Sequence, residues 1–198
     1  MIAFYLLAAI VLSYIAQLAI PGYTNILIFD PLSALTEPWR FVTSIFLHST
    51  TDMLHIFFNG YALFLFGTIL ESKITKKDFL TIFFIGGIVG SILYYLTIVV
   101  EFASPIPALG ASGAIYAVLG ATAVMLPEMR IYMWFFPMKM KYAVIFWVLM
   151  ETFGTLSVAS GIASAAHLGG LAFGLIYTKY FVKKEVPYDP YYWAVKEN

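Results

Sequence analysis

The sequence predicts an all-α membrane protein, built as a bundle of six transmembrane helices with both termini in the cytoplasm. Composition, the number of apolar runs and the distribution of basic residues all point to it. Of the 198 residues, 62% are hydrophobic and 11% are charged, whereas a soluble domain has about 45–50% apolar and 25% charged residues. This length suits one domain. We expect a membrane domain over residues 1–185 and a short cytoplasmic tail over residues 186–198.

Six apolar runs approach the length that a membrane helix needs, which is about 17–25 residues. They occupy residues 2–20, 53–70, 79–100, 109–126, 142–156 and 162–182. The fifth run is the weakest of the six because Glu151 interrupts it. Each run is expected to form one helix.

The basic residues set the predicted orientation. Ten of the eleven Lys and Arg residues lie in the second-to-third connection, in the fourth-to-fifth connection or at the C-terminal end. Cytoplasmic loops collect positive charge, so these three regions are expected to lie in the cytoplasm. The topology predicts a multi-pass membrane protein.

The first outer connection, residues 21–51, holds the remaining basic residue, Arg40. Connections longer than about 12–15 residues are usually functional or structured, so this one is expected to fold back onto the membrane. Trp39 and Arg40 fit an interfacial anchor, with the ring in the headgroup layer and the charge in water. An ordinary aromatic belt explains them equally well.

Charge and cysteine content exclude several classes. The formal net charge is zero and there is no basic block, so no nucleic-acid partner is expected. The absence of cysteine excludes disulfides, thiolate metal sites and a cysteine nucleophile. The lipid bilayer is the expected surrounding of the chain, and no cofactor is expected.

Ser112 is the candidate nucleophile. It lies in the string Gly110-Ala111-Ser112-Gly113 at the outer end of the fourth run, where preceding prolines prevent an earlier helix start. Unpaired N–H groups at a helix N-terminus can stabilise an oxyanion, and Gly113 permits a close approach by another chain segment. The competing interpretation is that Ser112 is only an N-cap on a helix-packing face.

His167 in the sixth run is the candidate base. Ala166, Gly170 and Gly174 repeat every four residues, so this helix can pack closely against the small-residue face of the fourth and bring His167 toward Ser112. Neutral imidazole can then accept the serine proton. No aspartate is present in the fourth or sixth run to orient the ring, so a dyad is expected.

Three further residues surround this pair. Tyr116 lies one turn after Ser112 on the same helix face and is the candidate to stack on the imidazole. His55 and Asn59 are an i, i+4 pair near the outer end of the second run, and both can donate a hydrogen bond to an oxyanion. A metal site is the rival interpretation, but Asn is a poor zinc ligand and no carboxylate has ligand spacing with His55.

Together, these motifs resemble the rhomboid family of intramembrane serine proteases, in its prokaryotic six-helix form, and the resemblance extends from Trp39 to Gly174. The string around Ser112 looks like the family's Gly-x-Ser-Gly, and the motif around His167 is similar to its sixth-helix signature. The resemblance implies that Ser112 is the nucleophile and His167 the base. It also implies that the Tyr116 ring packs against the imidazole of the base.

The resemblance also covers the second helix and the first outer loop. His55 and Asn59 match the His-x-x-x-Asn that the family uses, with the serine backbone amide, to bind the oxyanion. Trp39-Arg40 looks like the family's loop motif, and Glu71 matches a glutamate that ties helix ends together. His48 corresponds to a loop histidine, in a stretch that is longer here than in many relatives. Glu151 matches no family residue that we can name. The resemblance implies that the fifth helix moves when substrate enters, so a gating or packing partner is one interpretation of Glu151, but we expect it simply to reach the outer surface.

The resemblance implies hydrolysis of peptide bonds in transmembrane segments of membrane proteins. It also implies a location in a prokaryotic cell membrane. Two other interpretations stay open on the sequence. A non-catalytic relative that captures client helices would lack Ser or His, and both are present here. A channel or transporter would show inverted repeats or several buried charges, and the sequence shows no repeat.

Overall fold

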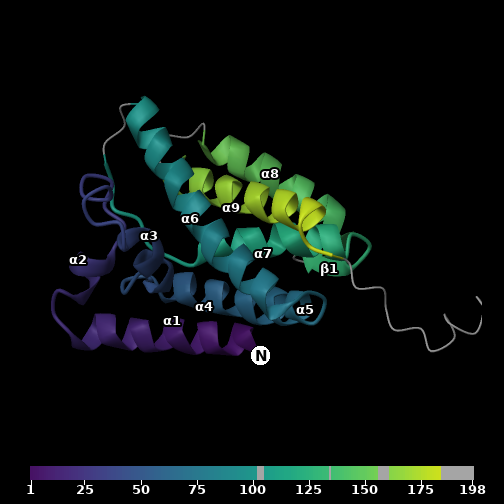
Figure 1. Cartoon of the computed structure of the whole chain (residues 1–198), viewed down its shortest axis with the longest axis horizontal. Coiled ribbons are helices and arrows are strands. Elements are labelled where there is room, and N and C mark those ends of the chain that lie inside the picture. Colours follow the sequence, from purple (N-terminus) through teal and green to yellow (C-terminus); the bar gives the residue numbers. More distant parts are fainter. Residues whose placement is uncertain (102–104, 134, 156–160, 184–198) are drawn as a thin grey trace, which may run out of the picture.

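The computed structural model describes residues 1–101, 105–133, 135–155 and 161–183. These residues form a mostly helical bundle (Figure 1). The second apolar run is a continuous helix over residues 53–71, interrupted by one π-helical turn at Leu63–Gly67. The long helical segments are α1 (Ile2–Ala19), α4 (Met53–Ala62) with η2 (Leu63–Gly67) and α5 (Thr68–Glu71), α6 (Lys76–Glu101), α7 (Ser112–Met125), α8 (Met140–Thr155) and α9 (Gly161–Tyr180).

Each of the six apolar runs therefore coincides with a helical segment. Within the part of the chain that the structure describes, three helices are long and apolar enough to cross a membrane, namely Ile2–Ala19, Met53–Glu71 and Lys76–Val100. Ser112–Met125 is a shorter apolar helix. Six crossings with both termini in the cytoplasm stay a prediction. The predicted tail, residues 186–198, lies outside the described residues.

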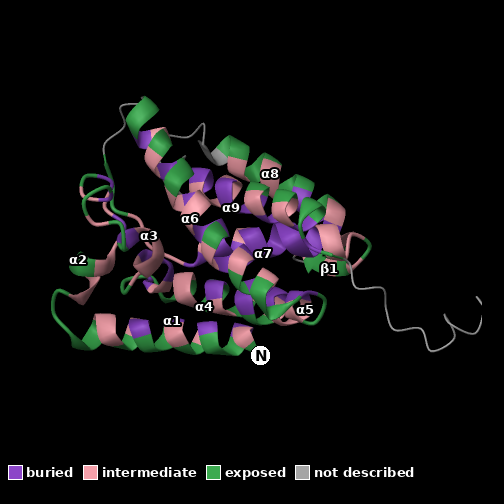
Figure 2. Ribbon diagram, viewed as in Figure 1, coloured by how far each residue is buried: buried purple, intermediate pink, exposed green. Residues whose placement is uncertain are grey.

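Helix α7 is the centre of the bundle, and ten of its fourteen residues are buried. Figure 2 shows this buried helix between the more exposed surrounding helices. A Cβ atom on Gly170 would overlap the carbonyl of Gly113, and one on Gly174 would overlap the carbonyl of Ala117. Helices α7 and α9 therefore touch along their backbones, which is the close packing expected of their small residues.

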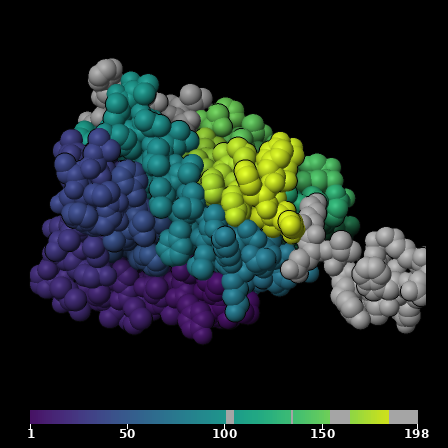
Figure 3. All heavy atoms as spheres, in the orientation of Figure 1, coloured from purple at the N-terminus to yellow at the C-terminus, as the bar shows by residue number. Residues whose placement is uncertain are grey.

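Helix α6 packs against the same pair of helices. A Cβ atom on Gly90 would lie 2.6 Å from the carbonyl oxygen of Ala166, and one on Gly86 would overlap the methyl group of Ala117. Figure 3 shows α9 directly beside α6 on the surface of the molecule. The three helices α6, α7 and α9 thus form a tight unit that leaves little freedom for the residues between them.

The first outer connection is folded, with short helices α2 (Tyr23–Leu27), α3 (Arg40–Thr43) and η1 (Ser44–Phe46). The expectation that Arg40 keeps its charge in water is wrong, since the residue is 8% exposed. Its Nη1 donates to the carbonyls of Asn25, at 2.8 Å, and Ile28, at 2.7 Å, and its Nε pairs with Glu37. These acceptors replace water around the guanidinium, so Arg40 ties the loop together.

Trp39 differs from the buried Arg40, because it is 47% exposed. Its indole N–H donates to the carbonyl of Ile26 at 3.3 Å.

The first connection also binds the segment that leads into α7. Phe29 and Ala108 exchange two backbone hydrogen bonds, at 3.0 and 2.8 Å, and the amide of Gly110 donates to the carbonyl of Ser44 at 3.0 Å. The loop therefore fixes where α7 begins.

Glu71, at the end of α5, caps α1. Its two carboxylate oxygens accept the N–H groups of Ile2, at 2.6 Å, and Ala3, at 3.0 Å. A carboxylate at this position satisfies amides that have no partner within the helix and lies at the positive end of the helix dipole. Glu71 thus joins the C-terminal end of the second helical segment to the start of the first.

The fourth-to-fifth connection contains a hairpin that the apolar pattern did not indicate, formed by β1 (Arg130–Met133) and β2 (Phe136–Lys139) in antiparallel register. Glu128 pairs with Lys139 at 2.6 Å and with Lys141. Hydrogen bonds from these two lysines lower the pKa of Glu128 to about 2. The exposed ion pairs link the base of the hairpin to the start of α8.

Candidate active site

Ser112 is the first residue of α7, and the N-cap of this helix is Ala111, which makes no side-chain cap hydrogen bond. The interpretation of Ser112 as an N-cap is therefore wrong. Gly110 precedes them with a φ of 127°, a left-handed conformation that favours glycine. This turn directs the Ser112 side chain toward α9.

His167 on α9 lies beside Ser112. Its Nε2 is 2.8 Å from the Ser112 hydroxyl oxygen, and its side chain is 15% exposed. The ring of Tyr116 is stacked on the imidazole, with centroids 4.3 Å apart and an angle of 2° between the planes. The backbone contact between α7 and α9 brings the three side chains together, because larger residues at the crossing would hold these helices apart.

Glu151 on α8 also reaches this site, and the expectation that it faces the outer surface is wrong. Its side chain is 14% exposed, and one carboxylate oxygen lies 2.9 Å from Nδ1 of His167. The same oxygen accepts the Tyr116 hydroxyl at 2.5 Å. The predicted dyad had no acid because the fourth and sixth runs contain no aspartate, whereas Glu151 lies in the fifth. The available signal was a carboxylate in an apolar run, since such residues are functional candidates by default.

His55 and Asn59 lie on α4, across Gly110 from the serine. A Cβ atom on Gly110 would be 2.8 Å from Nε2 of His55 and 3.8 Å from the Ser112 hydroxyl oxygen, so both atoms border the same small space. Nδ1 of His55 accepts the amide of Ser49 at 3.4 Å, which leaves the ring proton on Nε2 in the neutral form. His55 therefore presents a donor beside Gly110.

The structure places Asn59 one turn after His55 on α4, and the contact that Asn59 makes is with His55 and not with Ser112. Asn59 is buried, and its amide nitrogen donates to the carbonyl of His55 at 2.7 Å. A side-chain amide carries two N–H donors, so this bond uses one of them.

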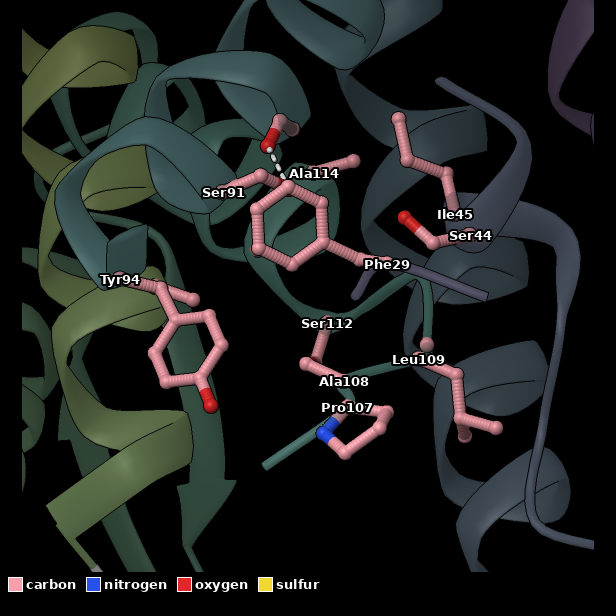
Figure 4. A pocket seen from close by; sticks show the side chains of 14 residues that line it. Phe29, Ser44, Ile45, Ser91, Tyr94, Pro107, Ala108, Leu109, Ser112 and Ala114 are labelled. Carbon is pink, nitrogen blue, oxygen red and sulfur yellow. Dashed lines mark hydrogen bonds between the residues drawn. The ribbon is translucent and has the colours of Figure 1, made fainter. Parts of the chain in front are cut away.

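A cavity of about 420 Å³ opens beside Ser112. Figure 4 shows Ser112 in this cavity among the side chains of Phe29 and Tyr94 and the segment that precedes α7. Polar groups line it as well, among them Ser44 and Ser91. Sequence reasoning missed these lining residues, because they come from the first connection and from α6, far from Ser112 along the chain.

His48 lies in the connection before α4 and is completely buried. Its backbone amide donates to the Gln17 side chain at 2.9 Å, and its carbonyl accepts from the same side chain at 3.0 Å. Its ring centroid is 5.1 Å from that of His55. Burial lowers the pKa of His48 to about 4, and the nearby His55 adds to the effect. His48 thus joins α1 to the connection before α4, next to His55.

We expect the stability of the protein in detergent to fall as the pH is lowered from about 6.5 to 4. In this interval the unfolded chain protonates His48 while the folded protein, with a pKa of about 4, does not, so lower pH favours unfolding. The loss should reach at most about 3 kcal/mol. Thermal unfolding of His48→Asn across this interval should show a weaker pH dependence than wild type. Equal pH dependence in the two proteins would contradict the assignment.

The fold and the site together define a helical membrane protein with a serine–histidine pair between two packed helices. Comparison with known proteins identifies its family. Residues 35–184 match the model of the Rhomboid domain. The chain therefore belongs to the rhomboid family and is an integral membrane protein.

Relatives occur in bacteria and in mitochondria. The chain is 33% identical to rhomboid protease GluP of Bacillus subtilis over 146 residues, which cover 73% of this chain and 26% of GluP. It is 31% identical to the mitochondrial presenilin-associated rhomboid-like protein of Homo sapiens over 132 residues, 65% of this chain and 35% of that protein. For mitochondrial rhomboid protein 1 of Saccharomyces cerevisiae, identity is 31% over 153 residues, 75% of this chain and 43% of the relative. The match spans less than half the length of each of these three relatives.

Proposed function

We propose that this protein is a serine endopeptidase that cleaves transmembrane segments of membrane proteins, with Ser112 as nucleophile and His167 as general base. The observation that carries the proposal is the 2.8 Å distance between Nε2 of His167 and the hydroxyl oxygen of Ser112, within a packed membrane domain. This is the reach that a base needs to accept the serine proton. Membership of a family that includes named rhomboid proteases supports it.

In the first half of the reaction, the Ser112 oxygen attacks the carbonyl carbon of the scissile bond while its proton moves to Nε2 of His167. The tetrahedral intermediate then collapses, and His167 returns the proton to the leaving amine as the C–N bond breaks. In the second half, His167 takes a proton from water, which attacks the acyl-enzyme. The ester bond breaks, Ser112 regains its proton, and the two peptide products are released.

The oxyanion of each tetrahedral intermediate would be held by the Ser112 backbone amide with His55 and Asn59. The amide of Ser112 lies at the N-terminus of α7, where backbone donors have no partner within the helix. The Nε2 donor of His55 borders Gly110, close to the hydroxyl of Ser112. Loss of one such donor typically costs about 10²–10³-fold in rate.

A helical substrate hides its carbonyls in its own hydrogen bonds, so cleavage requires local unwinding. Substrates should therefore carry Gly, Pro or small residues near the scissile bond, which weaken the helix. The cavity beside Ser112 offers room for a side chain next to that bond and for water. We place the protein in a prokaryotic cell membrane, and its proposed partners are the lipid bilayer and transmembrane protein substrates.

The test is made on the full chain in detergent. A model transmembrane substrate with small residues near its outer end should be cleaved, and a fluorophosphonate, which traps activated serines, should be found by mass spectrometry on the peptide that contains Ser112. Absence of both cleavage and labelling in the folded protein would overturn the proposal and favour a relative that only binds client helices. Labelling at another serine would overturn the assignment of the nucleophile.

A further inference from the structure

Glu151 is a carboxylate on α8, a helix that is otherwise largely apolar. A charged group in a membrane-embedded bundle is costly unless it is paired, and such residues face the interior and mark functional sites. Glu151 fits this rule, because its side chain is only 14% exposed. Its partners therefore indicate what it does.

Those partners lie on the two helices that form the site. One carboxylate oxygen accepts the Tyr116 hydroxyl of α7 at 2.5 Å and lies 2.9 Å from Nδ1 of His167 on α9. Ser164, also on α9 and one turn before the histidine, is a further hydrogen-bond partner of this carboxylate. Glu151 thus joins three helices at the Nδ1 edge of the imidazole ring, while Nε2 faces Ser112.

This contact fixes the form of the histidine. A neutral imidazole carries one proton, on either Nδ1 or Nε2. An ionised carboxylate only accepts hydrogen bonds, so the proton of His167 must lie on Nδ1, facing Glu151. The lone pair of Nε2 then faces the Ser112 hydroxyl, 2.8 Å away. In the opposite tautomer, Nε2 would carry the proton and would not act as a base.

We infer that Glu151 is a positioning residue for this site: through its hydrogen bond to Nδ1 it holds His167 in the tautomer and orientation needed to deprotonate Ser112. The inference rests on the proposed serine protease function. When the serine proton moves to Nε2, the ring becomes positively charged, and the adjacent carboxylate stabilises it while keeping its own charge. No proton moves to Glu151. Tyr116 assists twice, by stacking on the ring and by donating to the carboxylate.

A purely structural role would have different consequences. If Glu151 only held α8 against its neighbours, its loss would change how a transmembrane substrate enters between helices. It would not change the reactivity of Ser112 toward a small soluble reagent, nor the tautomer of His167. Measurements of these two properties therefore separate positioning from attachment.

The experiment compares wild type with Glu151→Gln in the full chain in detergent. Glutamine has the size of glutamate, but its N–H₂ group can donate to Nδ1 and favour the wrong tautomer. We expect the rate of Ser112 labelling by a soluble fluorophosphonate to fall by about 10²–10⁴-fold. NMR of the imidazole nitrogens should show His167 protonated on Nδ1 in wild type and on Nε2 in the variant.

The matched control is Glu128→Gln, the same substitution at an exposed glutamate whose partners are Lys139 and Lys141. Its labelling rate should equal that of wild type. Equal labelling by Glu151→Gln and wild type would overturn the inference, as would a variant that loses only the cleavage of the transmembrane substrate.

Failure of the proposed function would look different, because wild type itself would then neither label nor cleave. The NMR measurement on wild type still decides the positioning in that case, and it does so as well if Glu151→Gln does not fold. A wild-type His167 with its proton on Nε2 would overturn the inference.

Discussion

Replacement of either Ser112 or His167 by alanine is expected to lower the cleavage rate of a transmembrane substrate by roughly 10⁶-fold. The reason is that neither residue can catalyse the attack on the peptide bond without the other. Without His167, the Ser112 hydroxyl keeps its proton and is a weak nucleophile. Without Ser112, the base has no hydroxyl to activate, since its Nε2 faces that group at 2.8 Å.

The double variant supplies the sharper test. Because the two residues act as one unit, Ser112→Ala combined with His167→Ala should be no slower than either single variant. Rates are compared by single-turnover cleavage of the same substrate. Independent, multiplicative losses in the double variant would contradict the pairing, and so would a single variant that keeps a tenth or more of the wild-type rate.

Thermal unfolding separates the two single variants. Ser112→Ala removes only a hydroxyl and should unfold close to wild type. His167→Ala removes the imidazole hydrogen bond from the buried Glu151 carboxylate, and a hydrogen bond to a charged group contributes about 1.5–3 kcal/mol. The histidine variant should therefore unfold at a clearly lower temperature, although both variants are inactive for the same chemical reason.

Replacement of Gly170 by valine is expected to damage both stability and activity. A Cβ atom at this position would overlap the carbonyl of Gly113 on the facing backbone, and backbone cannot yield as a side chain does. Overpacking typically costs about 1–3 kcal/mol, and we expect the upper end of this range. Because α9 must move away from α7, His167 should also leave Ser112, and a displacement of about 1 Å can cost 10²-fold in rate.

The control for this variant is Ala172→Val, which places the same valine side chain on the exposed side of the same helix. It should leave both the unfolding temperature and the cleavage rate near wild type. A Gly170→Val protein with wild-type activity would show that the backbone contact of α7 and α9 does not set the distance between Ser112 and His167.

Much of the helical architecture was accessible from the sequence, because apolar runs and small-residue spacing are local properties of the chain. The six runs mark the helical segments, and the four-residue repeats around Gly113 and Gly170 mark the faces along which α7 and α9 touch. The hairpin at Arg130–Lys139 escaped prediction, since its short strands lack a clear alternating pattern.

The sequence by itself thus determined the membrane class, the helical segments and the candidates Ser112, His167 and Tyr116. Only the tertiary structure decided which side of α8 faces inward. A single carboxylate in an apolar run sets no periodicity, so rotation of α8 about its axis is invisible in the sequence, yet it places Glu151 2.9 Å from His167. The burial of Arg40 was also decided by the tertiary structure. Its guanidinium donates to the carbonyls of Asn25 and Ile28, and only the folding of the loop brings these residues beside it.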